Sequence, residues 1–104
     1  MLLGLHLKEL GFEDIRFEFQ FNPDRRWRAD LAVPGDRLLL ECCGGAFHGG
    51  HRRGAAMEIE YERLNWAQLN GWRILQFTNV AVLRGEAKAF LAEHLTTTNS
   101  GVRK

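Results

Sequence analysis

The segment 26–41 limits the possible folds most, because it predicts two strands joined by a tight turn. Polar and apolar residues alternate over 26–31, as in a strand with one buried face. Pro34-Gly35-Asp36 interrupts the pattern, and the leucine run 38–40 that follows predicts a second, more buried strand. A two-residue type II′ turn with glycine in its first position fits this break. The segment therefore predicts an antiparallel hairpin whose second strand lies inside a sheet.

The register of this hairpin brings two carboxylates together. A turn that pairs Pro34 with Arg37 places Asp30 opposite Glu41, and directly opposed residues have Cβ atoms about 5 Å apart. Such close carboxylates are destabilising unless a positive charge lies between them, and a hard divalent cation is the simplest candidate. We therefore expect a site for a hard divalent cation here. The alternative is a pair of solvated carboxylates, although Glu41 follows three leucines in a strand expected to be central.

Length and charge narrow the class of protein. The 104 residues predict one domain over 1–95 and a polar, flexible tail over 96–104. A net charge of +1 excludes a generally basic protein and leaves nucleic-acid binding to local patches. Cys42 and Cys43 are adjacent in a strand, so they point to opposite faces and should be reduced and unbridged. Because neither a membrane-length apolar run nor a signal-peptide pattern is found, we expect no membrane association and a cytoplasmic location.

The other residues predict helices and further strands around the hairpin. We expect a short helix ended by Gly11, a strictly alternating strand over 15–21, a helix over 55–70, a strand over 72–77, and a last helix capped by Thr78 or Asn79. In the helix over 55–70, apolar spacing predicts five inward side chains: Met57, Tyr61, Leu64, Trp66 and Leu69. A right-handed crossover makes the last strand parallel to its neighbour. The prediction is an α/β fold, ordered α-β-β-β-α-β-α, with a central mixed sheet flanked by helices.

This order, together with four stretches of sequence, resembles the PD-(D/E)XK nuclease superfamily. The stretches are EFQFNPDRRWRAD at 18–30, ECCGG at 41–45, HRRG at 51–54 and 60–73, which contains Glu60, Arg63 and Asn65. They look like a group of small phage-encoded endonucleases that is similar to the archaeal-type Holliday-junction resolvases. The resemblance implies that Asp30 and Glu41 are the ligands of a Mg²⁺ site, with the backbone carbonyl of Cys42 as a further ligand and Mn²⁺ as a substitute. It also implies a Mg²⁺-dependent DNA endonuclease of DNA recombination, a homodimer that acts on branched or duplex DNA in the host cytoplasm.

One position departs from the superfamily pattern. The superfamily has a lysine two residues after the glutamate, and this chain has Cys43 there. A thiol cannot polarise an attacking water as an ammonium does, so the positive charge must come from elsewhere. Arg63 is the first candidate, and Lys8 and the glycine-rich segment 44–54 are the others. Because a guanidinium is a poor proton acceptor, the role of Arg63 would be electrostatic.

Three further acids are candidates for the site. Glu18, on the polar side of the strand over 15–21, and Glu9, in the first helix, are alternative third carboxylates. Glu60 precedes Arg63 by three residues, so the two lie on one helical face and Glu60 is expected to position the arginine. Each of these acids is equally compatible with an ordinary surface charge.

Basic residues flank the two carboxylates in the sequence. Arg25, Arg26 and Arg28 form a rim beside Asp30. The segment 44–54 is expected to clamp phosphate groups through four side chains: His48, His51, Arg52 and Arg53. A zinc site is the rival interpretation, but Cys42-Cys43 lacks the spacing of a zinc motif. The three tryptophans are assigned to the core and not to base stacking.

Two other functions remain open. One is a nicking endonuclease on the same fold, of the very-short-patch type or associated with homing. The other is a catalytically inactive DNA-binding module that lost the superfamily lysine at Cys43.

Overall fold

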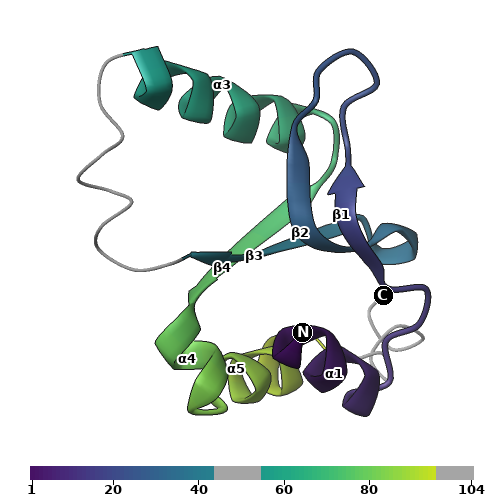
Figure 1. Ribbon diagram of the computed structural model, residues 1–104. Helices are drawn as coiled ribbons and strands as arrows, with labels where there is room; N and C mark the ends of the chain where they lie inside the picture. The colour runs from purple at the N-terminus through teal and green to yellow at the C-terminus, as the bar shows by residue number, and fades with distance from the viewer. Residues whose placement is uncertain (44–54, 96–104) are drawn as a thin grey trace.

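The computed structural model describes residues 1–43 and 55–95, which form a four-stranded mixed sheet with helices on both faces (Figure 1). The strands lie in the order β1-β2-β3-β4; the first two pairs are antiparallel, and β3 and β4 are parallel, as predicted. The elements are α1 (Leu2–Glu9), β1 (Arg16–Gln20), β2 (Arg28–Val33), η1 (Pro34–Asp36), β3 (Leu38–Cys43), α3 (Ala55–Leu69), β4 (Arg73–Thr78), α4 (Asn79–Leu83) and α5 (Glu86–His94). The predicted loop over 44–54 and tail over 96–104 lie outside the described residues. The α/β class and the order of elements agree with the sequence prediction.

The β2–β3 hairpin has the predicted register. Val33 pairs with Leu38 and Leu31 with Leu40. The predicted type II′ turn is wrong, because η1 is a 3₁₀ turn and the left-handed conformation falls on Arg37, at φ 53°. Contacts elsewhere hold Arg37 there: its guanidinium lies 4.0 Å from the centre of the Trp72 ring, and its carbonyl accepts the N–H of Arg73 at 2.8 Å. The turn is therefore of a different type than predicted, whereas the pairing of the two strands is as predicted.

Two apolar clusters fill the two sides of the sheet. The first lies between the sheet and α1, α4 and α5, and it includes Leu3, Leu7, Leu38, Leu40 and Leu91. The second lies between the sheet and α3, and it includes Phe21, Ala32, Leu39, Ala67 and Trp72. The three leucines of β3 are fully buried and alternate between the clusters, which makes β3 the centre of the core. Trp27 and Trp66 pack partly buried against the second cluster.

The first two strands change face at one point. In β1, Phe17 lies against Gly4 of α1, whereas Phe19 packs in the second cluster, although residues two apart in a regular strand share a face. Between them Glu18 adopts the left-handed conformation, at φ 49°. Phe17 pairs with Leu31 and Phe19 pairs with Ala29, so Asp30 lies opposite Glu18 at this irregularity. The strict alternation expected over 15–21 is therefore wrong at Glu18.

The inner face of α3 differs from the prediction. Tyr61 is 57% exposed and Leu69 is 87% exposed, so neither packs inward. Ala67 is the fully buried residue of the helix, and Arg63 and Glu60 lie one and two turns before it on the same side. The helix therefore presents charged groups to one end of the sheet, because that end carries charged partners instead of apolar ones.

The C-terminal helical region agrees with the prediction at its start. Thr78 caps α4, since its hydroxyl accepts the N–H of Ala81 at 3.0 Å. The expected single helix is divided at Gly85, whose φ of 77° separates α4 from α5. Within the described residues, no helix is long and apolar enough to cross a membrane.

Candidate active site

Asp30 occupies the point where β2 and β3 separate. The regular backbone pairing of the two strands extends as far as Leu31 and Leu40, and one residue further Asp30 Oδ2 accepts the N–H of Cys42 at 2.8 Å. The carboxylate thus bridges the two strands where the backbone ladder stops. Within a strand the N–H and C=O of one residue point to the same neighbour, so the Cys42 carbonyl also points towards β2.

Glu41 is the second carboxylate of this end of the sheet. Its side chain is 12% exposed, and its two oxygens have different partners. Oε1 accepts a hydrogen bond from Gln76 Nε2 at 3.0 Å, and Oε2 forms an ion pair with Arg63. Glu41 and Gln76 are directly paired residues of β3 and β4. The sequence patterns did not indicate a role for Gln76, although it is the polar residue of an otherwise apolar stretch, 74–77.

Arg63 reaches these groups from α3. Its side chain is 11% exposed, and it donates to Glu60 Oε2 at 3.1 Å and to the backbone carbonyl of Arg28 at 3.0 Å. Burial lowers the pKa of Arg63, and the negative charge of Asp30 acts in the opposite direction. The guanidinium also lies 5.4 Å from the centre of the Phe21 ring. One side chain therefore links α3 to the beginning of β2 and to β3.

Among the described residues of this cluster, acidic side chains outnumber basic ones. Three carboxylates, from Asp30, Glu41 and Glu60, act there on the guanidinium of Arg63. The positive charge expected near the paired carboxylates is present as this guanidinium. The same carboxylates that stabilise the positive charge of Arg63 would also stabilise a metal cation.

The oxygen atoms of this cluster suit the divalent ion that the sequence predicts. In residues 1–43 and 55–95, no three side chains of His, Cys, Asp or Glu are grouped so that they could hold a metal. Two carboxylates and the Cys42 carbonyl are nevertheless hard oxygen donors, and Mg²⁺ keeps several waters and needs few protein ligands. The Arg63 guanidinium already places a positive charge beside these carboxylates, because it pairs with Glu41 and is stabilised by the charge of Asp30. The donor set of Asp30 and Glu41 fits a hard divalent cation.

The two cysteines lie on either side of the sheet at this point and are both free thiols. Cys42 packs against the first cluster, and burial, followed by the charges of Asp30 and Cys43, raises the pKa of its thiol. Cys43 follows Glu41 by two residues on the α3 side, at the position where the sequence resemblance led us to expect a lysine. Arg63, the first candidate from the sequence, is the described residue that brings positive charge there.

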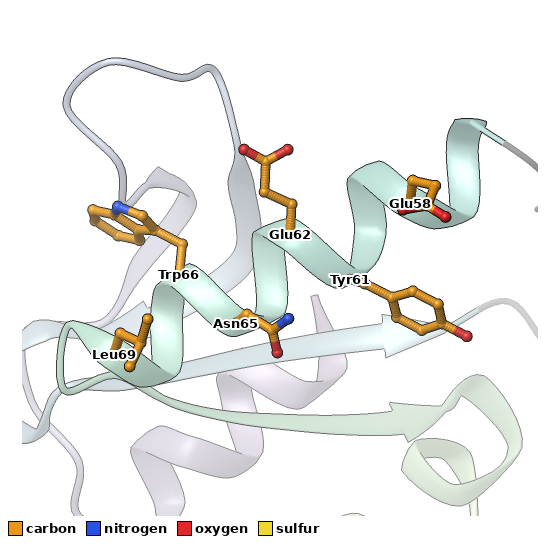
Figure 2. A pocket seen from close by; sticks show the side chains of 6 residues that line it. All are labelled: Glu58, Tyr61, Glu62, Asn65, Trp66 and Leu69. Atoms are coloured by element: carbon orange, nitrogen blue, oxygen red, sulfur yellow. The ribbon is translucent and has the colours of Figure 1, made fainter.

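Three of the predicted residues, Lys8, Glu9 and Asn65, lie away from this cluster, and a fourth, Glu18, lies beside it. Lys8 and Glu9 belong to α1, on the opposite side of the sheet from α3 (Figure 1). Glu9 pairs there with Lys88 of α5 at 2.7 Å, and this hydrogen bond lowers the pKa of Glu9. Glu18 lies on the edge strand β1 opposite Asp30. Asn65 lies on the outer surface of α3, where Figure 2 shows it beside Tyr61 and Leu69.

The loop between β1 and β2 displays the predicted arginine rim. Buried Asn22 accepts the N–H groups of Asp24 and Arg25 at 2.7 and 2.8 Å, and Gln20 donates to the carbonyl of Arg25 at 2.8 Å. The loop backbone is thus held by side chains of its own ends. Because its donors and acceptors are satisfied internally, it presents its outer side chains without needing a partner to order it.

The three arginines of this rim differ in their contacts. Arg25 pairs with Glu62 of α3 at 2.7 Å and stacks 4.8 Å from the centre of the Trp27 ring. The side chains of Arg26 and Arg28 are exposed, and neither has an ion-pair partner among the described residues. The other predicted phosphate-binding residues lie outside the described residues: His48, His51, Arg52 and Arg53.

A shallow groove follows the outer side of α3, away from the cluster. It is lined by Glu58, Tyr61, Glu62, Asn65, Trp66 and Leu69 (Figure 2). All six residues come from the one helix, so the groove is a feature of the surface of α3 and not a cleft between elements.

Comparison with known proteins returned no relatives. No protein-family model matches the chain, and neither the curated proteins nor the solved structures contain a significant match.

Proposed function

We propose that this protein is a metal-dependent DNA endonuclease with a PD-(D/E)XK core, a Holliday-junction resolvase acting as a homodimer. The observation that carries the proposal is the convergence of Asp30, Glu41 and Arg63 at the end of the β2–β3 hairpin. The α-β-β-β-α-β order of the described elements is compatible with that core. Two active sites per dimer are what symmetric nicking of a four-way junction requires.

Each residue of the cluster has a distinct part in this mechanism. Asp30, Glu41 and the Cys42 carbonyl would hold Mg²⁺ or Mn²⁺, which supplies Lewis acidity at a phosphoryl oxygen. Gln76 keeps the Glu41 carboxylate in one orientation through its hydrogen bond to Oε1. The Arg63 guanidinium neutralises charge on the phosphate and so supplies, electrostatically, the positive charge that the superfamily takes from the lysine missing at Cys43.

The exposed arginines bring the DNA to this cluster. Arg26 and Arg28 bind phosphates of the backbone from the pre-ordered β1–β2 loop and the start of β2. Such contacts position the duplex without reading its sequence, which suits an enzyme that recognises DNA structure. Arg25 supports the loop through its pairing with Glu62.

The proposal is tested with a labelled four-way junction and its matching linear duplex, in Mg²⁺, Mn²⁺ or EDTA. We expect paired symmetric nicks on the junction and none in EDTA. Asp30→Asn and Glu41→Gln should each reduce cleavage by about 100-fold or more, because several kcal/mol of charge stabilisation are lost. Asp24→Asn, an exposed acid of the β1–β2 loop, is the matched control and should retain activity.

Each other outcome corresponds to a different function. Full activity of Asp30→Asn contradicts the assignment of the ligands. Cleavage of both substrates favours a nicking endonuclease of the very-short-patch or homing type over a resolvase.

An inactive DNA-binding module is favoured by one observation, the thiol of Cys43 in the place of the lysine. That function predicts tight DNA binding without product in either metal, and gain of cleavage in Cys43→Lys.

A further inference from the structure

We infer that Arg63 is an exchangeable counter-ion: it neutralises Glu41 when no divalent ion is bound, and it transfers to a phosphate of the DNA when a divalent ion takes Glu41. The inference rests on the proposed function, because it describes how the same site passes between two states. It adds that a side chain of the protein, Arg63, competes with the metal ion for Glu41.

Arg63 and a divalent ion compete for Glu41, because the two oxygens of this carboxylate already have partners. Oε1 accepts a hydrogen bond from Gln76 Nε2 at 3.0 Å, which fixes the orientation of the carboxylate and directs Oε2 towards Arg63. Arg63 occupies Oε2. A guanidinium and a divalent ion repel each other strongly at contact distance in a partly buried site. The two cations are therefore alternative partners of Glu41.

Arg63 has other partners that remain when the ion pair with Glu41 is broken. Glu60, on the same helix, accepts from Nη1 at 3.1 Å, and the Arg28 carbonyl accepts from Nη2 at 3.0 Å. A guanidinium has five N–H donors, so these two bonds leave donors free for a phosphate oxygen. The Arg28 contact also holds the guanidinium at the beginning of the strand that carries Asp30. Glu60 is thus the residue that positions Arg63 through the exchange.

Metal affinity measures this competition without any DNA. We would titrate Mn²⁺ into the whole protein, follow free Mn²⁺ by electron paramagnetic resonance, and compare the wild type with Arg63→Gln. Removal of the competitor should tighten Mn²⁺ binding at least about tenfold, because repulsion between the guanidinium and the metal ion in a partly buried site exceeds the roughly 1.4 kcal/mol that a tenfold change represents. Arg25→Gln is the matched control, an arginine paired with an acid of α3 on the outer surface, and should change affinity less than about twofold.

The results separate the inference from the function it rests on. Equal or weaker Mn²⁺ binding by folded Arg63→Gln overturns the exchange and leaves the metal-dependent nuclease standing. Binding of Mn²⁺ by neither protein overturns both.

A second measurement needs no variant of the site. Nitrogen NMR of the arginine side chains in the wild type should show the Arg63 guanidinium shifting on addition of Mg²⁺. An Arg63 signal that stays unchanged at saturating Mg²⁺ overturns the exchange even if Arg63→Gln fails to fold.

Discussion

Glu18 shows how one residue conformation affects a neighbouring strand. A non-glycine residue at φ 49° inside a strand is uncommon, and here it lies where β1 and β2 both change face. Asp30, opposite Glu18, is the residue whose carboxylate accepts the N–H of Cys42. The irregularity releases Asp30 from ordinary strand pairing, so Glu18 contributes to the candidate site through its backbone.

This interpretation predicts the effects of substitutions at Glu18. Glu18→Gly should leave the free energy of unfolding nearly unchanged, since glycine adopts positive φ without steric cost. Glu18→Val should lower it by about 1–2 kcal/mol, because a β-branched residue is poorly accommodated there. Urea denaturation measures both values, with Arg16→Val as the control at another exposed position of β1, where the side chain forms a solvent-exposed ion pair with Asp14. Equal effects of valine at the two positions would contradict the left-handed conformation of Glu18.

At the scale of elements, the sequence predicts β3 better than α3. The apolar run 38–40 reflects burial on both faces, which is a property of the strand itself. The inner face of α3 depends on the sheet beneath it, and there Glu41 selects Arg63 as its partner. The apolar stripe through Tyr61 and Leu69 therefore predicted the wrong side.

The residues of the candidate site also differ in how far they could be predicted from the sequence. Asp30 and Glu41 follow from the register of one hairpin, which is local, and Arg63 followed from a resemblance and not from spacing. Gln76 could be assigned only from the parallel register of β3 and β4, which joins residues 35 apart in the chain. The type of the turn at Pro34 could not be predicted, because Trp72, distant in sequence, holds Arg37.

A pair of leucines tests the assignment of the two elements. Leu39 is fully buried in β3, and Leu39→Ala should lower the free energy of unfolding by about 2–5 kcal/mol through the cavity it leaves. For Leu69, at 87% exposure, the same change should lower it by less than about 0.5 kcal/mol. Chemical denaturation measures both variants. A comparable loss of stability for Leu69→Ala would place that side chain in the core, as the apolar spacing of α3 had suggested.

At the scale of the whole molecule, the arginines proposed to bind DNA and the ion pair of Glu9 with Lys88 lie on different sides of the sheet. The net charge is +1, so the proposed attraction to DNA would depend on where the cations lie and not on their excess. The β1–β2 loop and the beginning of β2 carry exposed arginines, while α1 and α5 pair charges such as Glu9 and Lys88 on the opposite side of the sheet. One side of the molecule is therefore the expected DNA surface.

The salt dependence of DNA binding tests that arrangement. Removing one side chain that binds a phosphate should reduce the slope of log K against log salt by about one. Arg26→Gln and Arg28→Gln should each show this reduction, and Arg25→Gln should show less, because its side chain is already paired with Glu62. Fluorescence anisotropy at several salt concentrations measures the slopes. A reduction as large for Arg25→Gln as for Arg28→Gln would mean that the Glu62 pairing does not restrict Arg25.

The parallel pairing of β3 with β4 also determines when the site can appear during folding. The β2–β3 hairpin is local and closes at a small entropic cost, whereas Gln76 must be brought to Glu41 across 35 residues. We therefore expect Asp30 and Glu41 to approach each other before Gln76 and Arg63 reach them. Two like charges would then lie together without their counter-charge until α3 and β4 dock. Their repulsion would destabilise the isolated hairpin and favour completion of the fold.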